Sequence, residues 1–253
     1  SPIIKKVSLT GSVEVGREIL KMAAEGIKKV SMELGGHAPV LVYDDTDVDY
    51  AATTCSNTKF RNCGQVCISP TRFYVQEKIY DDFCKKFVEN TKKLKLGNGL
   101  DPDTNVGPLA NKRGLDHIDK LVRDAENKGA EILLGGAPSK KFNKGYFYEP
   151  TVLKNVPHNA DILKIEPFGP VAPIIKVSDE GKLFEMANST EFGLAGYVFT
   201  SSLKRAHVAS ESLEVGMVGV NDMLLAAAEI PFGGVKESGF GREGGSLGIL
   251  DYL

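Results

Sequence analysis

Cys67 has the clearest potential for covalent chemistry in this chain. It follows the polar and flexible residues Asn62 and Gly64-Gln65 and precedes an extended stretch, so it lies at the boundary of an element. A thiolate is a strong nucleophile, and a position at the start of a helix would favour it. The alternative is a small buried apolar residue, as many free cysteines are. Cys63 could share a helical face with Cys67, although we expect Cys63 to be a packing residue.

Two acidic residues have surroundings that suit catalysis or binding. Glu33 ends an apolar segment and is followed by Leu34 and two glycines. Proteins with parallel sheets place functional groups at the carboxyl ends of strands, where a carboxylate can act as a general base. Glu166 precedes Pro167-Phe168-Gly169-Pro170, a rigid turn with an aromatic residue. The alternative for both carboxylates is an ordinary solvated loop charge.

A third candidate lies near the start of the chain. Residues 3–9 predict a strand, Thr10-Gly11-Ser12 a turn, and residues 13–25 a helix with apolar side chains at helical spacing. The free N–H groups and positive dipole end of such a helix suit a phosphate group. The simpler interpretation of Ser12 is an N-cap, because the full G-x-G-x-x-G pattern is absent.

The composition excludes several classes of protein. The 253 residues are 42% apolar and carry a net charge of −2, so no basic excess indicates nucleic-acid binding. No run of about 18 apolar residues predicts a membrane span. The four histidines are scattered, so we predict no metal site. The four cysteines do not form a disulfide framework at this length, and we expect a reducing, cytoplasmic location.

The remaining elements alternate between strands and helices. Further strands are predicted over residues 28–33, 40–43, 72–75, 131–134, 171–177, 196–200 and 216–221, and helices over about 48–61, 79–94, 115–128, 182–188 and 203–213. The glycines of residues 231–245 are expected to let the backbone pass close to other elements. The alternation predicts an α/β fold with mostly parallel sheets.

Taken together, these segments resemble the aldehyde dehydrogenase superfamily over nearly the whole chain. The matching motifs, in order, are Thr10-Gly11-Ser12 with Gly16, Glu33 to Gly36, Phe60 to Cys67, Glu166 to Pro170, Asn221, and Pro231 to Gly245. The resemblance implies a three-layer α/β catalytic domain of aldehyde dehydrogenase type, with the last strand–helix unit of a Rossmann-like cofactor domain. It divides the chain into a remnant of the NAD(P)-binding domain (1–35), the catalytic domain (36–237), and a C-terminal segment that returns toward the cofactor domain (238–253).

The resemblance also implies a role for each candidate residue. Cys67 attacks an aldehyde, hydride passes to NAD or NADP, and Glu33 activates the water that hydrolyses the thioester. Glu166 holds the ribose of the cofactor and Phe168 packs beside it. The full set of implied cofactor-binding residues is Gly11, Ser12, Val15, Leu34, Gly35, Glu166 and Phe168.

Arg61 and Phe232 are implied substrate-binding residues, and Arg61 matches a position that binds the substrate carboxylate in succinate-semialdehyde dehydrogenases. The chain departs from that subgroup at two places. The loop Leu224 to Ala228 has alanines where the subgroup has a carboxylate-binding serine, and Ser69 replaces a redox-partner cysteine. The substrate indicated is succinate semialdehyde or a similar semialdehyde.

Family members are much longer than this chain, and both ends look cut. We therefore expect a part of a longer polypeptide that is inactive or nearly so alone and forms a homo-oligomer at full length. Two alternatives stay open. One is an acylating relative that passes the thioester to coenzyme A, against which Glu33 argues. The other is a non-catalytic structural or binding protein with the same fold.

Overall fold

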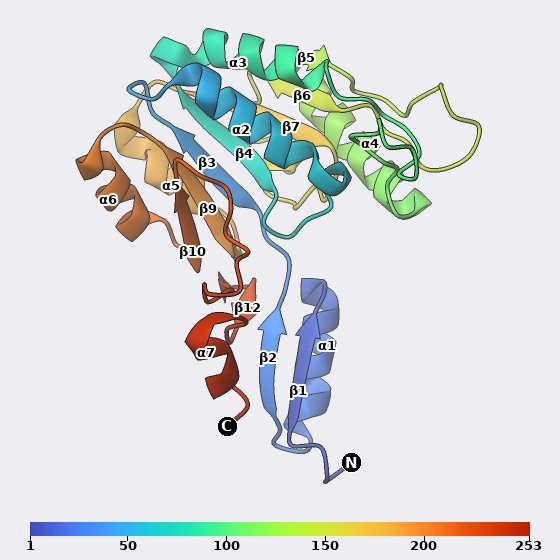
Figure 1. Cartoon of the computed structure of the whole chain (residues 1–253), viewed down its shortest axis with the longest axis vertical. Helices are drawn as coiled ribbons and strands as arrows, with labels where there is room; N and C mark the ends of the chain where they lie inside the picture. Colours follow the sequence, from blue (N-terminus) through green and yellow to red (C-terminus); the bar gives the residue numbers. More distant parts are fainter.

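The first unit of the chain is a strand, a helix and a parallel strand that stand apart from the main sheet (Figure 1). The computed structural model describes residues 1–253. Strand β1 (Lys6–Thr10) pairs with β2 (Lys29–Glu33), and α1 (Val13–Ala24) connects them. Ser12 caps α1, since its hydroxyl accepts a hydrogen bond of 3.4 Å from the Val15 N–H. The predicted N-cap and the strand–turn–helix order are therefore confirmed.

The main sheet has seven strands in the order β10-β9-β3-β4-β7-β6-β5. Its strands are β3 (Ala38–Val42), β4 (Pro70–Gln76), β5 (Glu131–Leu134), β6 (Thr151–Lys154), β7 (Val171–Val177), β9 (Ala195–Phe199) and β10 (Met217–Val220). All neighbouring strands are parallel except β5 and β6. The α/β prediction is confirmed, but the sequence pattern did not predict β6 because its four residues follow a long loop.

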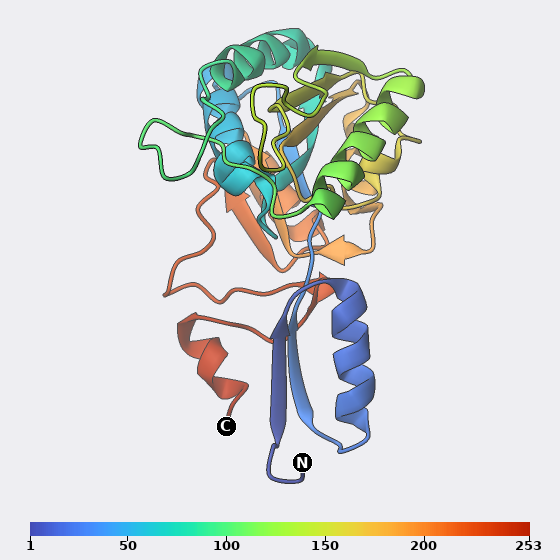
Figure 2. The same cartoon turned by 90° about the vertical axis from the view of Figure 1, so that its right-hand side faces the viewer.

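Helices cover both faces of this sheet. The helices are α2 (Val48–Phe60), α3 (Glu77–Thr91), α4 (Lys112–Asn127), α5 (Leu183–Asn188) and α6 (Leu203–Ser212). Helices α2 and α3 pack side by side on one face, and α4 lies on the other (Figures 1 and 2). None of the helices combines the length and the apolar character needed to cross a membrane.

The core lies between the central strands and these helices. Strands β3 and β9 are buried over their whole lengths, as expected of parallel strands covered on both faces. On the α3 side, Phe87 packs edge-on against Phe60 and Phe73. A well-filled interior of this kind holds the ends of the strands rigidly, and the candidate active site lies at those ends.

The C-terminal segment returns to the first unit. Strand β11 (Val235–Lys236) pairs with β8 (Phe192–Gly193), and β12 (Gly239–Phe240) pairs antiparallel with β2 before α7 (Gly245–Leu250). Gly239 has φ +103°, and a Cβ there would lie 2.0 Å from the Met32 carbonyl oxygen. The close backbone approach predicted for the glycine-rich stretch is confirmed.

Candidate active site

Cys67 lies in a turn that leads into β4, and not at the start of a helix. After α2, a 3-10 turn over Arg61–Gly64 contains the left-handed residues Asn62 (φ 49°) and Cys63 (φ 58°). The suggestion that Cys63 and Cys67 share a helical face is therefore wrong. Cys63 is buried in the hydrophobic core, which confirms that it is a packing residue.

Glu33 and Cys67 meet across the gap between β2 and the main sheet. Burial and then the Glu33 carboxylate raise the pKa of the Cys67 thiol to about 12. Burial also raises the pKa of Glu33, whereas hydrogen bonding with the Cys67 thiol lowers it. A thiolate favoured by a helix dipole, the expectation for a cysteine at a helix start, is thus wrong here. The thiol is therefore protonated in the resting site near neutral pH.

Parallel pairing explains how two segments so distant in sequence converge. Strand β3 follows Glu33 directly, β4 follows Cys67, and the two strands begin side by side, with Ala38 paired to Pro70. Gly36 closes the contact, because a Cβ there would lie 2.5 Å from the Cys67 carbonyl oxygen. The Oε1 atom of Glu33 is buried and has no hydrogen-bond partner. A buried acceptor of this kind is suited to a water or substrate proton.

Glu166 reaches the same region from the loop before β7. Its Oε1 accepts a hydrogen bond of 3.1 Å from the Gly36 N–H. A Cβ on Gly35 would lie 2.6 Å from Glu166 Oε2, so only glycine permits this approach. Burial raises the pKa of Glu166 to about 7, against the opposing effects of the Gly36 hydrogen bond and Lys59. Phe168, two residues on, is 45% exposed and adopts φ 45°.

The other predicted cofactor residues surround the start of α1, and several already have partners in the fold. The Gly11 N–H donates to the Glu33 carbonyl at 3.0 Å, and the Val15 N–H donates to Ser12. Leu34 is buried against Gly16. The Val15 side chain is exposed. These residues form a surface that a cofactor could approach, but the Gly11 and Val15 amides are not free donors.

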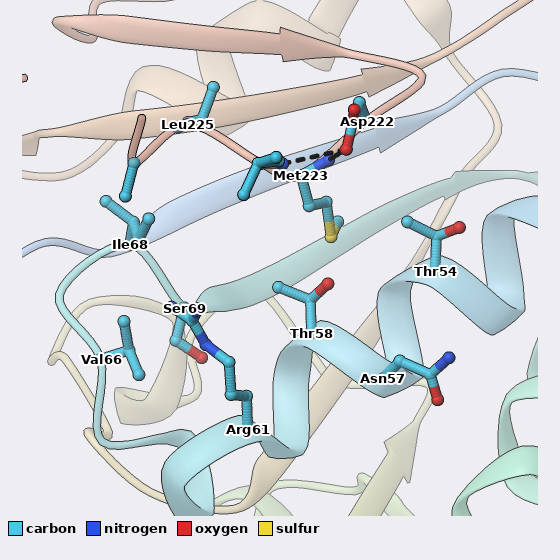
Figure 3. A pocket seen from close by; sticks show the side chains of 12 residues that line it. Thr54, Asn57, Thr58, Arg61, Val66, Ile68, Ser69, Asp222, Met223 and Leu225 are labelled. Carbon is cyan, nitrogen blue, oxygen red and sulfur yellow. Dashed lines mark hydrogen bonds between the residues drawn. The ribbon is translucent and has the colours of Figure 1, made fainter. Parts of the chain in front are cut away.

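A cavity of about 280 Å³ lies on the other side of the Cys67 turn. It is lined by Thr54, Asn57, Thr58, Arg61, Val66, Ile68, Ser69, Asp222, Met223, Leu224, Leu225 and Ala226 (Figure 3). Val66 and Ile68, the neighbours of Cys67 in the sequence, line this cavity, whereas the Cys67 side chain does not. Arg61 lines the cavity as its predicted role requires, whereas Phe232 does not.

Sequence inspection missed three residues that hold the site together. The Ser238 hydroxyl donates to the Gly35 carbonyl at 2.6 Å and accepts from the Gly193 N–H at 3.0 Å. His37 is buried, with its ring nitrogens bonded to Thr71 and to the Ile162 carbonyl. Lys59 is buried against Ser69. The one available signal was that His37 and Lys59 adjoin recognised motifs, since a polar residue beside a motif is often buried with it.

Comparison with known proteins gives a consistent result. The family model described as "Aldehyde dehydrogenase family" matches residues 1–253. A glutarate-semialdehyde dehydrogenase from Pseudomonas putida is 45% identical over 251 residues, which are 99% of this chain and 52% of that protein. An NADP⁺-dependent succinate-semialdehyde dehydrogenase from Escherichia coli is 44% identical over 253 residues, 100% of this chain and 52% of that protein.

Solved structures agree with the sequence comparison. A succinate-semialdehyde dehydrogenase from Burkholderia pseudomallei superposes with a TM-score of 0.97 at 42% identity, over 100% of this chain and 52% of that one. The chain spans about half the length of the curated relatives it matches.

Proposed function

The chain belongs to the aldehyde dehydrogenase family, and we propose that its site oxidises an aldehyde to a carboxylic acid with NAD or NADP. The observation that carries the proposal is the closeness of the Cys67 thiol and the Glu33 carboxyl, each of which shifts the pKa of the other. A cavity large enough for a small substrate lies on the other side of the Cys67 turn. A nucleophile next to a buried base is the arrangement that covalent catalysis needs.

The reaction begins when the Cys67 thiol loses its proton to solvent and the sulfur attacks the aldehyde carbon, which leaves the Glu33 carboxylate free for the later step. A C–S bond forms, and the carbonyl π electrons move to oxygen. Bound NAD(P)⁺ supplies the acceptor for the hydride that then leaves this carbon, which turns the adduct into a thioester on Cys67. Because burial raises the pKa of Glu33, the carboxylate is a stronger base than an exposed one.

Hydrolysis completes the cycle. Glu33 removes a proton from a water molecule, and the resulting hydroxide attacks the thioester carbon. The C–S bond breaks, the electron pair returns to sulfur, and the acid leaves. The partnerless Oε1 of Glu33 supports this role, because it is an acceptor available to the attacking water. The net change is one aldehyde, one NAD(P)⁺ and one water to one carboxylate, one NAD(P)H and two protons.

The residues around Gly35 and Glu166 fit a nicotinamide cofactor. Because Gly35 has no side chain, its backbone can lie close to the Glu166 carboxyl, in space that a Cβ would fill. A carboxyl group can accept hydrogen bonds from ribose hydroxyls. We propose that Glu166 orients the ribose and that Phe168 packs beside it. Ser12 and Val15 would approach the phosphate side. The relative from E. coli is named for NADP⁺, which supports NADP as one cofactor.

The proposed substrate is a short aldehyde with a carboxylate at its far end. Arg61 is a permanent positive charge on the wall of the cavity, which Val66 and Ile68 of the Cys67 turn also line. The names of the P. putida and E. coli relatives, glutarate-semialdehyde and succinate-semialdehyde dehydrogenase, support this class.

Three wider features are part of the same proposal. The first is the division into a cofactor-domain remnant, a catalytic domain and a returning C-terminal segment. The second is a homo-oligomer in the full-length form. The third is a reducing compartment, which the four unpaired cysteines support.

The experiment that tests the reaction follows the acyl group on Cys67. The protein is mixed with succinate semialdehyde and NADP⁺, and mass spectrometry and NADPH absorbance are recorded. We expect Glu33→Gln to retain an acyl group on Cys67 that the unchanged protein releases as acid, and Cys67→Ser to form none. Acid release by Glu33→Gln at the unchanged rate would exclude Glu33 as the hydrolytic base. Release that requires coenzyme A would instead identify the acylating relative.

A further inference from the structure

Ser69 presents a hydroxyl group to the cavity, and a buried lysine lies behind it. The Nζ atom of Lys59 donates to Ser69 Oγ at 3.2 Å. Lys59 is 0% exposed and Ser69 is 3% exposed. Ser69 nevertheless lines the cavity, as does Arg61 (Figure 3). Lys59 has no part in the chemistry proposed above. Burying an ammonium group costs free energy of folding unless the group is paired or hydrogen-bonded.

Of the hydrogen-bond donors in this pair, the Ser69 hydroxyl has no acceptor. A charged lysine has only donors, so Ser69 Oγ must accept from it. The hydroxyl has one hydrogen of its own, and no protein atom accepts it in the structure, because the contact with Lys59 is the hydroxyl's only hydrogen bond. The Ser69 backbone N–H is occupied separately by the Val66 carbonyl at 2.9 Å. The free O–H hydrogen can therefore turn toward the cavity.

We propose that the Ser69 hydroxyl, oriented by Lys59, is a second donor beside Arg61 for the anionic group of the substrate. This makes Ser69 a specificity-determining residue and Lys59 a positioning residue. The inference rests on the proposed function for the nature of the substrate, a short aldehyde with a distal carboxylate. A carboxylate has two oxygens, so a guanidinium and a hydroxyl can bind it together.

The loop across the cavity supplies no competing side-chain hydroxyl. The N–H groups of Met223 and Leu224 are already donated to Asp222 Oδ1, and Leu225 and Ala226 have no polar side-chain atom. This loop is the one whose alanines replace a serine in the resembled subgroup. We infer that it covers the methylene chain of the substrate, while the anion is bound from the wall formed by Arg61 and Ser69.

Other polar residues of the cavity lie further along α2. Thr54 is seven positions before Arg61, which corresponds to roughly 10 Å along the helix axis. Asn57 and Thr58 lie between them and could contact a longer substrate.

The protonation state of Lys59 controls the direction of the Ser69 hydrogen. Burial lowers the pKa of Lys59 to about 7, against the opposing charges of Cys63 and Glu166. Lys59 in turn contributes to the lowered pKa of the buried His37. Once Lys59 is neutral, its amine can accept the Ser69 hydrogen, and the hydroxyl no longer has to point into the cavity. Affinity for an anion should therefore fall as the pH rises through about 7.

The test uses two probes that differ in charge and not in shape. Valerate carries a carboxylate and valeramide is its neutral match, and neither can react with Cys67. Binding to the 253-residue chain is followed by NMR shifts of the backbone amides around residues 66–69. We expect valerate to bind more tightly than valeramide. Ser69→Ala should weaken valerate about tenfold, as for loss of one hydrogen bond to a charged group. It should weaken valeramide clearly less, because a neutral carbonyl oxygen accepts a weaker hydrogen bond than a carboxylate.

Three further variants complete the design. Ser201→Ala, which removes an exposed hydroxyl outside the cavity, should bind both probes as the unchanged chain does. Lys59→Met should remove the fall in valerate affinity near neutral pH. Glu166→Gln should keep a fall in affinity but move it to lower pH, because the Glu166 charge raises the pKa of Lys59. This outcome separates Lys59 from the other group that titrates in this range.

Two results would overturn the inference: equal or undetectable binding of the two probes by the unchanged chain, or unchanged valerate affinity in Ser69→Ala. Because no step of this titration involves Cys67 chemistry, such a result leaves the acyl-enzyme test of the proposed function unaffected. Conversely, an unreactive Cys67 with intact valerate binding would count against the proposed function alone.

Discussion

Cys67 and Glu33 each shift the pKa of the other away from its ordinary value. The carboxylate raises the pKa of the thiol, and the thiol lowers a carboxyl pKa that burial has raised. In the resting protein Cys67 is therefore a neutral thiol beside a base, and not a thiolate. Because the thiolate is the form that is readily oxidised, the neutral thiol is protected until a substrate is in place.

Replacing Glu33 by Gln should make Cys67 more reactive toward alkylation while it stops turnover. The change removes a negative charge that opposes the thiolate, so the pKa of Cys67 falls and more thiolate is present at pH 8. We expect alkylation by iodoacetamide to become several-fold faster in Glu33→Gln, as measured by mass spectrometry of the peptide that contains Cys67.

Glu166→Gln is the control for this experiment, since Glu166 is the weakest of the influences that raise the pKa of Cys67. Its effect on the alkylation rate should be in the same direction and smaller. A slower reaction in Glu33→Gln would mean that the carboxylate assists the sulfur more than its charge opposes it.

Sequence alone singled out Glu33 and Cys67, which the structure brings close together, but it could not predict their proton states. The positions of Glu33 and Cys67 follow from strand ends and motif order. Their pKa shifts depend on burial and on which side chains face each other, which appear only in three dimensions. Lys59 illustrates the limit, because a lysine near the end of a helix is normally solvated, and here it is completely buried.

At the scale of elements, the site depends on how closely the segment before β3 passes the Cys67 turn. Gly36→Ala would place a Cβ 2.5 Å from the Cys67 carbonyl oxygen. Because a backbone atom cannot move away cheaply, we expect a loss of about 2 kcal/mol in the free energy of unfolding. Urea denaturation measures this loss, and Cys67 alkylation should change with it.

Gly99→Ala is the matched control, because a Cβ there meets nothing within 4 Å. It should leave both the stability and the alkylation rate close to those of the unchanged chain. If Gly36→Ala were equally harmless, the segment before β3 would have to be free to shift, and the geometry of the Gly36–Glu166 hydrogen bond would not be fixed by the fold.

Element prediction succeeded where the periodicity was long and failed where pairing was long-range. The helices over 77–91 and 112–127 have clear apolar stripes, and both were predicted to within a few residues. Strands β8, β11 and β12 have two residues each. No sequence pattern specifies such short strands, because they exist only where a distant segment offers hydrogen-bond partners.

At the scale of the whole molecule, the C-terminal segment connects the two parts of the structure. Strand β12 pairs with β2, so that Gly239 lies opposite Glu33, and the Leu34 N–H donates to the Ser238 carbonyl at 3.0 Å. The strand that carries the proposed base is thus held from both sides, by β1 and by a segment more than 200 residues later in the chain.

Ser238 is the residue through which this connection can be tested. Its hydroxyl joins Gly35, between the two sheets, to Gly193 in β8. Ser238→Ala would leave a buried carbonyl and a buried N–H without partners, which costs about 2 kcal/mol or more. We expect that loss in urea denaturation. We also expect faster hydrogen exchange in residues 33–36 and a changed Cys67 alkylation rate, since Glu33 would be held less firmly.

Ser56→Ala separates this connection from the general effect of removing a buried hydroxyl. Ser56 is as buried as Ser238, but its hydroxyl donates only to the Thr53 carbonyl within its own helix. Its replacement by alanine should therefore cost little and should leave exchange at residues 33–36 unchanged. Equal effects of the two variants would show that Ser238 acts by local packing. A selective effect of Ser238→Ala would show that the C-terminal segment fixes the distance between Glu33 and Cys67.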